Sequence, residues 1–325
     1  MLLLLLLLFC LLLVAACFGC SMSRLRRPSS RRLLLAALGL LSVLAFWSSS
    51  EGAASFAGAS WATRKEGIRT LGRLPRAAGQ AGNALPELYI YDHCPFCVRA
   101  RIIFGMKNIK HNLVWMANDD VDTPTALVGK KISPILQLPG ESAMFESLDI
   151  VRKIDMDPAW GPPLLKPASA REDLDAVDKR TIEAVRLLLR PRVIRAYLPE
   201  FAHKDGRTAY LRNHPIADPV GGEVPEKAAW LAMGEEKWKS WYDAHFENSP
   251  ALLAELNSVL PDFEGLIHSE DSVSPGGASY DDIVFFAKMR TASLIKGLKP
   301  GPRLQAYMER MSDLSQIPLY SGMAV

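Results

Sequence analysis

The period of the hydrophobic pattern changes repeatedly after residue 85. Short alternating or β-branched apolar runs predict strands, and apolar residues spaced three or four apart predict helices between them. The predicted order is strand, helix, strand, helix, strand, strand, helix. These elements are placed at 87–91, 95–107, 111–116, 123–129, 134–138, 143–145 and 147–155.

Capping residues delimit two of these predicted helices. Thr123 is interpreted as an N-cap and Gly129 as the end of the same helix, and Ser147 is interpreted as the N-cap of the next helix. A βαβ unit followed by a hairpin and a helix is the plan of the thioredoxin fold. The sequence therefore predicts an α/β, thioredoxin-like domain over residues 86–157.

A proline-rich segment follows this domain and predicts a linker at 158–168. From residue 169 to 325 strand signals are nearly absent, which predicts an all-α helical domain. Helices are expected at 170–200, 226–247, 250–268, 280–297 and 302–313, with a loop or broken helix at 204–225. Ser279 and Asp282 fit a capping box at the start of one helix. The tryptophans between 230 and 241 are interpreted as core residues.

Composition and charge exclude several classes of protein. The chain has 325 residues, of which 49% are hydrophobic and 22% charged, which excludes a disordered chain. Five cysteines are too few for a disulfide scaffold. Residues 1–86 carry a net charge of +8, and since the whole chain carries +3, the remainder carries −5. A mildly acidic remainder argues against a nucleic-acid partner.

Residues 1–85 are interpreted as a targeting leader and are left out of the fold prediction. Read from Met22 instead of Met1, a basic segment and the apolar run 33–47 have the pattern of a signal sequence. The following stretch is rich in Ala, Arg and Gly, like a transit peptide. Together they predict delivery to a plastid by a bipartite presequence. The alternatives are a membrane anchor or the secretory pathway, with membrane contact only through the uncleaved leader.

The central chemical feature is the sequence Cys94-Pro95-Phe96-Cys97, directly after a predicted strand and at the start of a predicted helix. A helix N-terminus stabilises a thiolate, and Arg99 and Arg101 are expected to add positive potential. We expect Cys94 to be an exposed nucleophile. Cys97, one turn later, is expected to be more buried and to act as the resolving thiol in a Cys94–Cys97 redox disulfide.

Other roles for the two cysteines are weaker. A zinc site needs four ligands, and the sequence has no second CxxC pair. A purely structural disulfide is disfavoured because a CxxC after a strand in a βαβ context is typical of redox motifs. No bound metal is therefore expected.

Two further positions lie beside the cysteines in this fold plan. Ser133-Pro134 precedes the third strand, where a cis peptide bond would turn the Ser133 backbone toward a substrate. Glu146-Ser147 opens the following helix, whose free N–H groups can hold a carboxylate.

Several segments together resemble the glutaredoxin 2 family, the large two-domain glutaredoxins with a glutathione-transferase-like fold. The segments that carry the resemblance are LYIYDHCPFCVRARIIFGMKNI, NDDVDTPTALVGKKISPILQ, FESLDIV, SYDDI and QIPLYSGMAV. The resemblance implies glutathione-dependent disulfide oxidoreductase activity, with disulfide-containing or glutathionylated proteins as partners. It implies catalytic Cys94 and Cys97, and glutathione as a co-substrate. The implied glutathione contacts are Pro95, Phe96, Ser133, Pro134, Glu146 and Ser147.

The chain departs from the family pattern in two places. Phe96 stands where such glutaredoxins commonly carry Tyr, and the helical domain is expected to be longer around 204–235. Alternatives on the same fold are a glutathione transferase or dehydroascorbate reductase, and a non-enzymatic interaction module. Iron–sulfur cluster binding is disfavoured by Pro95.

Overall fold

The computed structural model describes residues 84–325. The predicted targeting leader lies outside the described residues, apart from its last two positions, so the plastid presequence stays a prediction. In the described part of the chain, no helix is long and apolar enough to cross a membrane.

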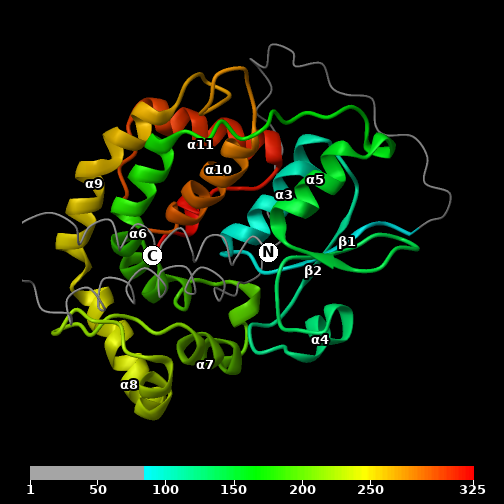
Figure 1. The fold of residues 1–325 in the computed structure, drawn as a ribbon. Coiled ribbons are helices and arrows are strands. Elements are labelled where there is room, and N and C mark those ends of the chain that lie inside the picture. The colour runs from blue at the N-terminus through cyan, green and yellow to red at the C-terminus, as the bar shows by residue number, and fades with distance from the viewer. Residues whose placement is uncertain (1–83) are drawn as a thin grey trace, which may run out of the picture. The chain divides into compact units, whose positions relative to one another are not determined.

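The first part of the described chain is a four-stranded sheet with three helices (Figure 1). The strands are β1 (Glu87–Ile90), β2 (Asn112–Trp115), β3 (Ile135–Gln137) and β4 (Met144–Phe145), and the helices are α3 (Pro95–Met106), α4 (Asp122–Val128) and α5 (Ser147–Met156). The strand order is β2-β1-β3-β4; β1 is parallel to β2 and antiparallel to β3, and β3 is antiparallel to β4. This arrangement confirms the thioredoxin-like prediction.

Both predicted N-caps in this part are wrong by one or two residues. The helix α4 begins at Asp122, so Thr123 lies inside it and donates its backbone N–H to Asp120 Oδ1 over 3.0 Å. Ser147 is the first residue of α5, and Glu146, at φ 76°, is the N-cap. At the start of α4 the carboxylate of Asp120 is the hydrogen-bond acceptor, whereas residue type alone predicted that the Thr123 hydroxyl would have this role. Gly129 ends α4 in the left-handed conformation, as predicted.

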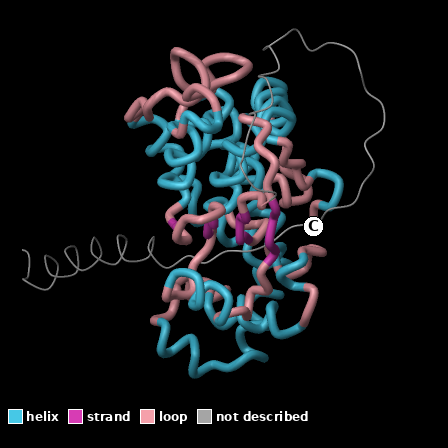
Figure 2. Tube along the Cα trace, turned by 90° about the vertical axis from the view of Figure 1, so that its right-hand side faces the viewer, coloured by secondary structure: helices cyan, strands magenta, loops and turns pink. Residues whose placement is uncertain are grey.

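The rest of the described chain is helical, which confirms the all-α second part (Figure 2). The helices are α6 (Glu172–Val193), α7 (Lys204–Asn213), α8 (Lys227–Glu247), α9 (Ser249–Leu266), α10 (Tyr280–Ala292) and α11 (Pro302–Ser315). One-turn 3-10 helices lie at Pro158–Trp160, Pro199–Phe201 and Ser321–Met323. The segment predicted as a loop or broken helix therefore contains a regular helix, α7, whose apolar residues are consecutive instead of periodic.

The capping box at the start of α10 is present as predicted. Ser279 Oγ accepts from the Asp281 N–H over 3.2 Å, and Asp282 Oδ2 accepts from the Ser279 N–H over 2.9 Å. Asp282 Oδ1 also accepts from the Val273 N–H and the Tyr307 hydroxyl. These bonds fix the start of a helix whose last turn reaches the loop after β1. The tryptophans 230, 238 and 241 are buried, as predicted.

The two parts of the described chain share one hydrophobic core. The helix α3 packs against α5 on one side and against α10 and α11 on the other (Figure 1). Buried residues of β1 and α3, such as Leu88 and Ile102, belong to the same apolar cluster as Phe286 and Met308 from the helical part. The fold therefore places the start of α3 against the helical part.

Gly105 permits the close approach of α3 to the end of α11. A Cβ atom at this position would lie 1.8 Å from the Ser315 carbonyl oxygen, a backbone atom that cannot rotate away. We expect Gly105→Ala to lower the free energy of unfolding by about 1–3 kcal/mol. The measurement is thermal unfolding, where 1 kcal/mol corresponds to about 2–4 °C for a domain of this size.

Gly265→Ala is the matched control for this prediction. Gly265 lies in α9 with no atom within 4 Å of its added Cβ, so the change should be neutral or slightly stabilising. Equal unfolding midpoints for the two variants would contradict the close helix contact.

Candidate active site

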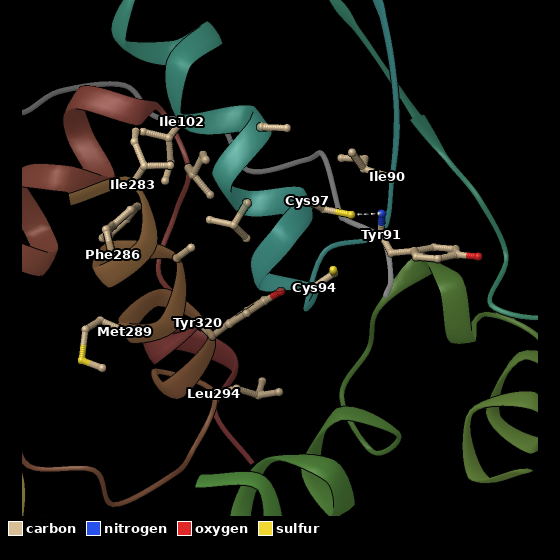
Figure 3. Close-up of a cluster of buried hydrophobic side chains, with 14 of the residues drawn as sticks. Ile90, Tyr91, Cys94, Cys97, Ile102, Ile283, Phe286, Met289, Leu294 and Tyr320 are labelled. Atoms are coloured by element: carbon tan, nitrogen blue, oxygen red, sulfur yellow. Dashed lines mark hydrogen bonds between the residues drawn. The ribbon is translucent and has the colours of Figure 1, made fainter. Parts of the chain in front are cut away.

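The loop after β1 delivers Cys94 to the positive end of α3 (Figure 3). Cys94 is the N-cap, with φ −71° and ψ 115°, and Pro95 occupies the first turn, where no N–H is needed. The first turn contains no acidic residue that would oppose a negative charge. The helix therefore presents free backbone N–H groups to the Cys94 sulfur.

Cys97 lies in the first turn of α3 and points back toward the sheet. Its Sγ accepts from the Tyr91 backbone N–H over 3.3 Å (Figure 3). The same sulfur lies 3.0 Å from Ser133 Oγ. The Ser133–Pro134 peptide bond is cis, as predicted. The structure thus brings Cys97 and Ser133 together from elements 36 residues apart.

The sheet register brings Pro134, Glu146 and Ser147, which are also predicted glutathione contacts, to the edge of the sheet beside the Cys94 loop. Ile135 pairs with Tyr89 of β1 and with Phe145 of β4. Pro134 precedes Ile135 and Glu146 follows Phe145. Both therefore lie at the end of the sheet where β1 leads into the Cys94 loop. At that edge Ser147 is buried, whereas Glu146 is exposed.

The two thiols have opposite pKa shifts. Burial raises the pKa of Cys94, but hydrogen bonds from the Cys97 thiol and from the N–H groups of Cys97 and Phe96, with the Arg99 charge, outweigh it and lower the pKa. Burial and the adjacent Cys94 raise the pKa of Cys97 well above its ordinary value, against the opposing effects of Ser133 and Tyr91. Cys94 is therefore the stronger acid of the pair, as the predicted nucleophile must be.

The prediction that Cys94 is exposed is wrong. Its exposed fraction is 2%, and that of Cys97 is 0%. Cys94 belongs to an apolar cluster that includes Met289 and Leu294 of the helical part, and the Tyr320 side chain lies beside the start of α3 (Figure 3). The prediction considered only β1 and α3, in which the N-terminus of α3 would be exposed to solvent. In the structure the helical part packs over that N-terminus.

The two predicted basic residues have different partners. The Arg99 guanidinium lies 4.6 Å from the centre of the Phe96 ring, and its charge helps to lower the pKa of Cys94. Arg101 forms a buried ion pair with Asp92 and lies over the Trp115 ring. Arg99 thus has the predicted effect on the thiol, and Arg101 balances a buried carboxylate.

Three residues of the helical part hold the loop before Cys94, and the sequence analysis did not identify them. Arg290 donates to the Asp92 backbone oxygen over 2.6 Å and to its carboxylate over 2.9 Å. Thr291 Oγ1 donates to the His93 carbonyl over 3.3 Å, and Glu200 Oε1 lies 2.8 Å from His93 Nδ1. These contacts span 107 to 198 residues, so no local sequence pattern indicates them.

The described residues contain no group of three or more His, Cys, Asp or Glu side chains that is arranged to hold a metal ion. Cys94 and Cys97 are both free thiols in this structure. The chemistry that the site offers is therefore that of a buried dithiol at a helix N-terminus.

Comparison with known proteins adds family matches over most of the described chain. Residues 88–162 match the N-terminal domain of glutathione S-transferases, and residues 224–324 match the C-terminal domain of glutaredoxin 2. Glutaredoxin 2 of Escherichia coli (strain K12) is 34% identical over 240 residues, which cover 74% of this chain and 100% of that protein.

A solved structure of a glutaredoxin 2 is also similar to this chain. Glutaredoxin 2 from Salmonella typhimurium, solved in complex with glutathione, is 32% identical with a TM-score of 0.63, and the match covers 75% of this chain and 100% of that one. A dehydroascorbate reductase from Chlamydomonas reinhardtii is 16% identical with a TM-score of 0.35, covering 74% of this chain and 93% of that one. The second similarity is too low to carry an argument about function.

We expect Arg99→Met to raise the pKa of the Cys94 thiol, because a positive charge that favours the thiolate is lost. Arg99→Lys, which keeps the charge, should remain closer to wild type. The measurement is the pH dependence of iodoacetamide alkylation at Cys94 in a Cys97→Ser background. Identical profiles for wild type and Arg99→Met would exclude an electrostatic role for Arg99.

Proposed function

The chain belongs to the glutaredoxin 2 family and is therefore a glutathione-dependent thiol–disulfide oxidoreductase, and we propose that Cys94 is its nucleophile and Cys97 its resolving thiol. The observation that carries the assignment of roles is geometric: Cys94 is the N-cap of α3, and Cys97 lies behind it against Tyr91 and Ser133. The opposite pKa shifts of the two thiols agree with this placement. Only a thiolate attacks a disulfide efficiently, so the thiol with the lower pKa reacts first.

With a glutathionylated protein, one thiol is sufficient. The Cys94 thiolate attacks the glutathione sulfur, the protein–glutathione S–S bond breaks, and the protein leaves as a thiolate that takes up a proton. A glutathione thiolate then attacks the Cys94–glutathione disulfide. This step forms oxidised glutathione and returns Cys94 to its thiolate form.

With a protein disulfide, both thiols are needed. Cys94 attacks one sulfur, and the other leaves as a thiolate, so Cys94 is now in a mixed disulfide. Cys97 then loses its proton and attacks Cys94 Sγ, which releases the second protein thiolate and forms the Cys94–Cys97 disulfide. Two molecules of glutathione reduce this bond and leave as oxidised glutathione.

The coupling between the two thiols sets the order of these steps. Burial raises the pKa of Cys97 most, and the hydrogen bond to Cys94 and the negative charge of the Cys94 thiolate raise it further. Both disappear when the Cys94 sulfur enters a mixed disulfide, whereas the opposing contributions of Ser133 and Tyr91 remain. Cys97 therefore becomes easier to deprotonate at the step in which it must attack.

Glutathione binds along the sheet edge that carries the cis proline. In this proposal the Ser133 backbone and Pro134 contact the cysteinyl part of the peptide, and Pro95 and Phe96 line the neighbouring surface. The N-terminus of α5 at Ser147 receives the γ-glutamyl carboxylate, and Glu146 pairs with the amino group. The shared register of β1, β3 and β4 supports this placement, and the glutathione complex of the Salmonella relative supports glutathione as the ligand.

Replacement of each cysteine tests the mechanism. We expect Cys94→Ser to abolish glutathione-dependent reduction of a small glutathione mixed disulfide. Cys97→Ser should retain that activity and lose reduction of a protein disulfide, because only the second reaction needs a resolving thiol. The measurement is oxidation of NADPH by glutathione reductase coupled to each substrate.

Other outcomes of the same assay would favour the competing functions. A wild-type protein that is inactive with glutathione disulfides but conjugates a chlorinated aromatic acceptor would be a transferase. Inactivity in both assays would favour an interaction module. Protein substrates are disulfide-containing or glutathionylated proteins in this proposal.

The proposed location is the plastid, and it is supported by the signal-like and transit-like composition of residues 1–85. We expect a fluorescent protein fused after residue 85 to accumulate in plastids when expressed in an alga with secondary plastids. Deletion of residues 54–85, which removes the transit-like part, should leave the fusion in the secretory pathway. Plastid signal from the deleted form would contradict a bipartite presequence.

A further inference from the structure

Glu200 is a buried acid that the thiol-exchange mechanism does not use. It lies in the one-turn helix Pro199–Phe201 of the helical part, and its side chain has an exposed fraction of 0%. Its Oε1 lies 2.8 Å from His93 Nδ1, and its Oε2 has no hydrogen-bond partner in the described part of the chain. Burial of a carboxyl group that lacks a full set of hydrogen-bond partners lowers the stability of the folded protein. The position of Glu200 beside the active-site loop therefore needs an explanation.

Burial disfavours a net charge on the His93–Glu200 pair. It raises the pKa of Glu200 well above the ordinary range and, together with His214, lowers the pKa of His93 well below it. The other charged groups facing the pair are Asp92 and Arg290, which form an ion pair with each other. Burial therefore disfavours a negative charge on Glu200 close to the Cys94 thiolate.

His93 is the residue directly before Cys94, and its ring is enclosed by the helical part. The ring stacks on Phe201 at 5.6 Å between centroids and meets the edge of Tyr210 at 5.3 Å. The carbonyl oxygen of His93 accepts from Thr291. The hydrogen bond to Glu200 is the polar contact that fixes the rotation of the ring between these neighbours.

We propose that Glu200 is a positioning residue for thiol exchange that acts through His93. By holding the His93 ring through the 2.8 Å hydrogen bond, it fixes the main chain on which Cys94 enters α3. That position aligns the Cys94 sulfur with the N–H groups of Phe96 and Cys97. The inference rests on the proposed role of Cys94 as the nucleophile.

Two substitutions of Glu200 separate its hydrogen bond to His93 from the acidity of its side chain. Removing the side chain frees the His93 ring, and the sulfur then loses part of its alignment with the helix N-terminus. A neutral amide of the same shape keeps a hydrogen-bond partner for His93 and introduces no charge. Glu200→Ala and Glu200→Gln should therefore differ in their effect on the thiol, although both remove the acid.

The test measures the reactivity of Cys94 in the full chain carrying Cys97→Ser. Iodoacetamide alkylation is followed against pH on the peptide that contains Cys94, by mass spectrometry, which separates it from the cysteines at 10, 17 and 20. We expect Glu200→Ala to raise the apparent pKa of Cys94 and to slow alkylation near neutral pH on the order of threefold or more. Glu200→Gln should restore the wild-type profile.

Asp282→Asn is the matched control, because Asp282 is also a fully buried acid of the helical part but caps α10. It should lower the unfolding midpoint and leave the alkylation profile of Cys94 unchanged. If Glu200→Ala behaves like this control, with a lower midpoint and an unchanged profile, Glu200 is only structural and the proposal is wrong.

A second variant tests whether Glu200 acts through His93. His93→Phe keeps a ring against Phe201 and Tyr210 but removes the nitrogen that meets Glu200, so it should raise the pKa of Cys94 as Glu200→Ala does. In the His93→Phe background, Glu200→Ala should have no further effect. Additive effects would contradict the proposal. Should Glu200→Ala not fold, an unchanged profile for His93→Phe alone would also contradict it.

These outcomes are distinguishable from a failure of the proposed function. If Cys94 in the otherwise unchanged protein alkylates no more readily than an ordinary cysteine, the assignment of the nucleophile fails. If Cys94 is reactive and Glu200→Ala leaves it so, only the positioning role fails.

Discussion

The buried ion pair between Asp92 and Arg290 is the interaction on which the rest of the site depends. Asp92 lies in the loop between β1 and the first turn of α3, and Arg290 lies near the end of α10. The guanidinium also contacts the Tyr320 hydroxyl and the Pro318 carbonyl, so a single side chain joins the thiol loop, a helix and the C-terminal segment. Loss of Asp92 would leave the buried guanidinium of Arg290 without its carboxylate partner, at a cost of about 3–5 kcal/mol.

This pairing makes the helical part a component of the active site. The helical part holds the loop before Cys94, and it covers the sulfur so fully that reactivity cannot arise from exposure. Hydrogen bonds at a helix N-terminus and a nearby guanidinium stabilise the thiolate instead, inside a site where desolvation alone would oppose it. The same burial, with the hydrogen bond to Cys94 and the charge of its thiolate, raises the pKa of Cys97, and the part due to Cys94 is lost once Cys94 has reacted.

The features predicted correctly from the sequence are those that depend on neighbouring residues. The order of strands and helices follows from the period of the apolar positions. The two cysteines fall at the start of α3 because a strand and a proline precede the helical pattern. The capping box at Ser279 and the cis bond before Pro134 were also predicted, the latter from its place in the fold plan. The caps at Thr123 and Ser147 failed because residue type does not fix a helix start to one position.

The sequence by itself determined the reactive groups and the α/β plan that carries them, because both are set by residue type and short-range spacing. Only the tertiary structure decided the burial of Cys94 and the partners of Asp92 and His93. Those contacts join residues 107 to 198 positions apart. These contacts depend on how the helical part packs against α3. The hydrophobic pattern predicts that one face of α3 is buried, but it does not identify the residues that pack against that face.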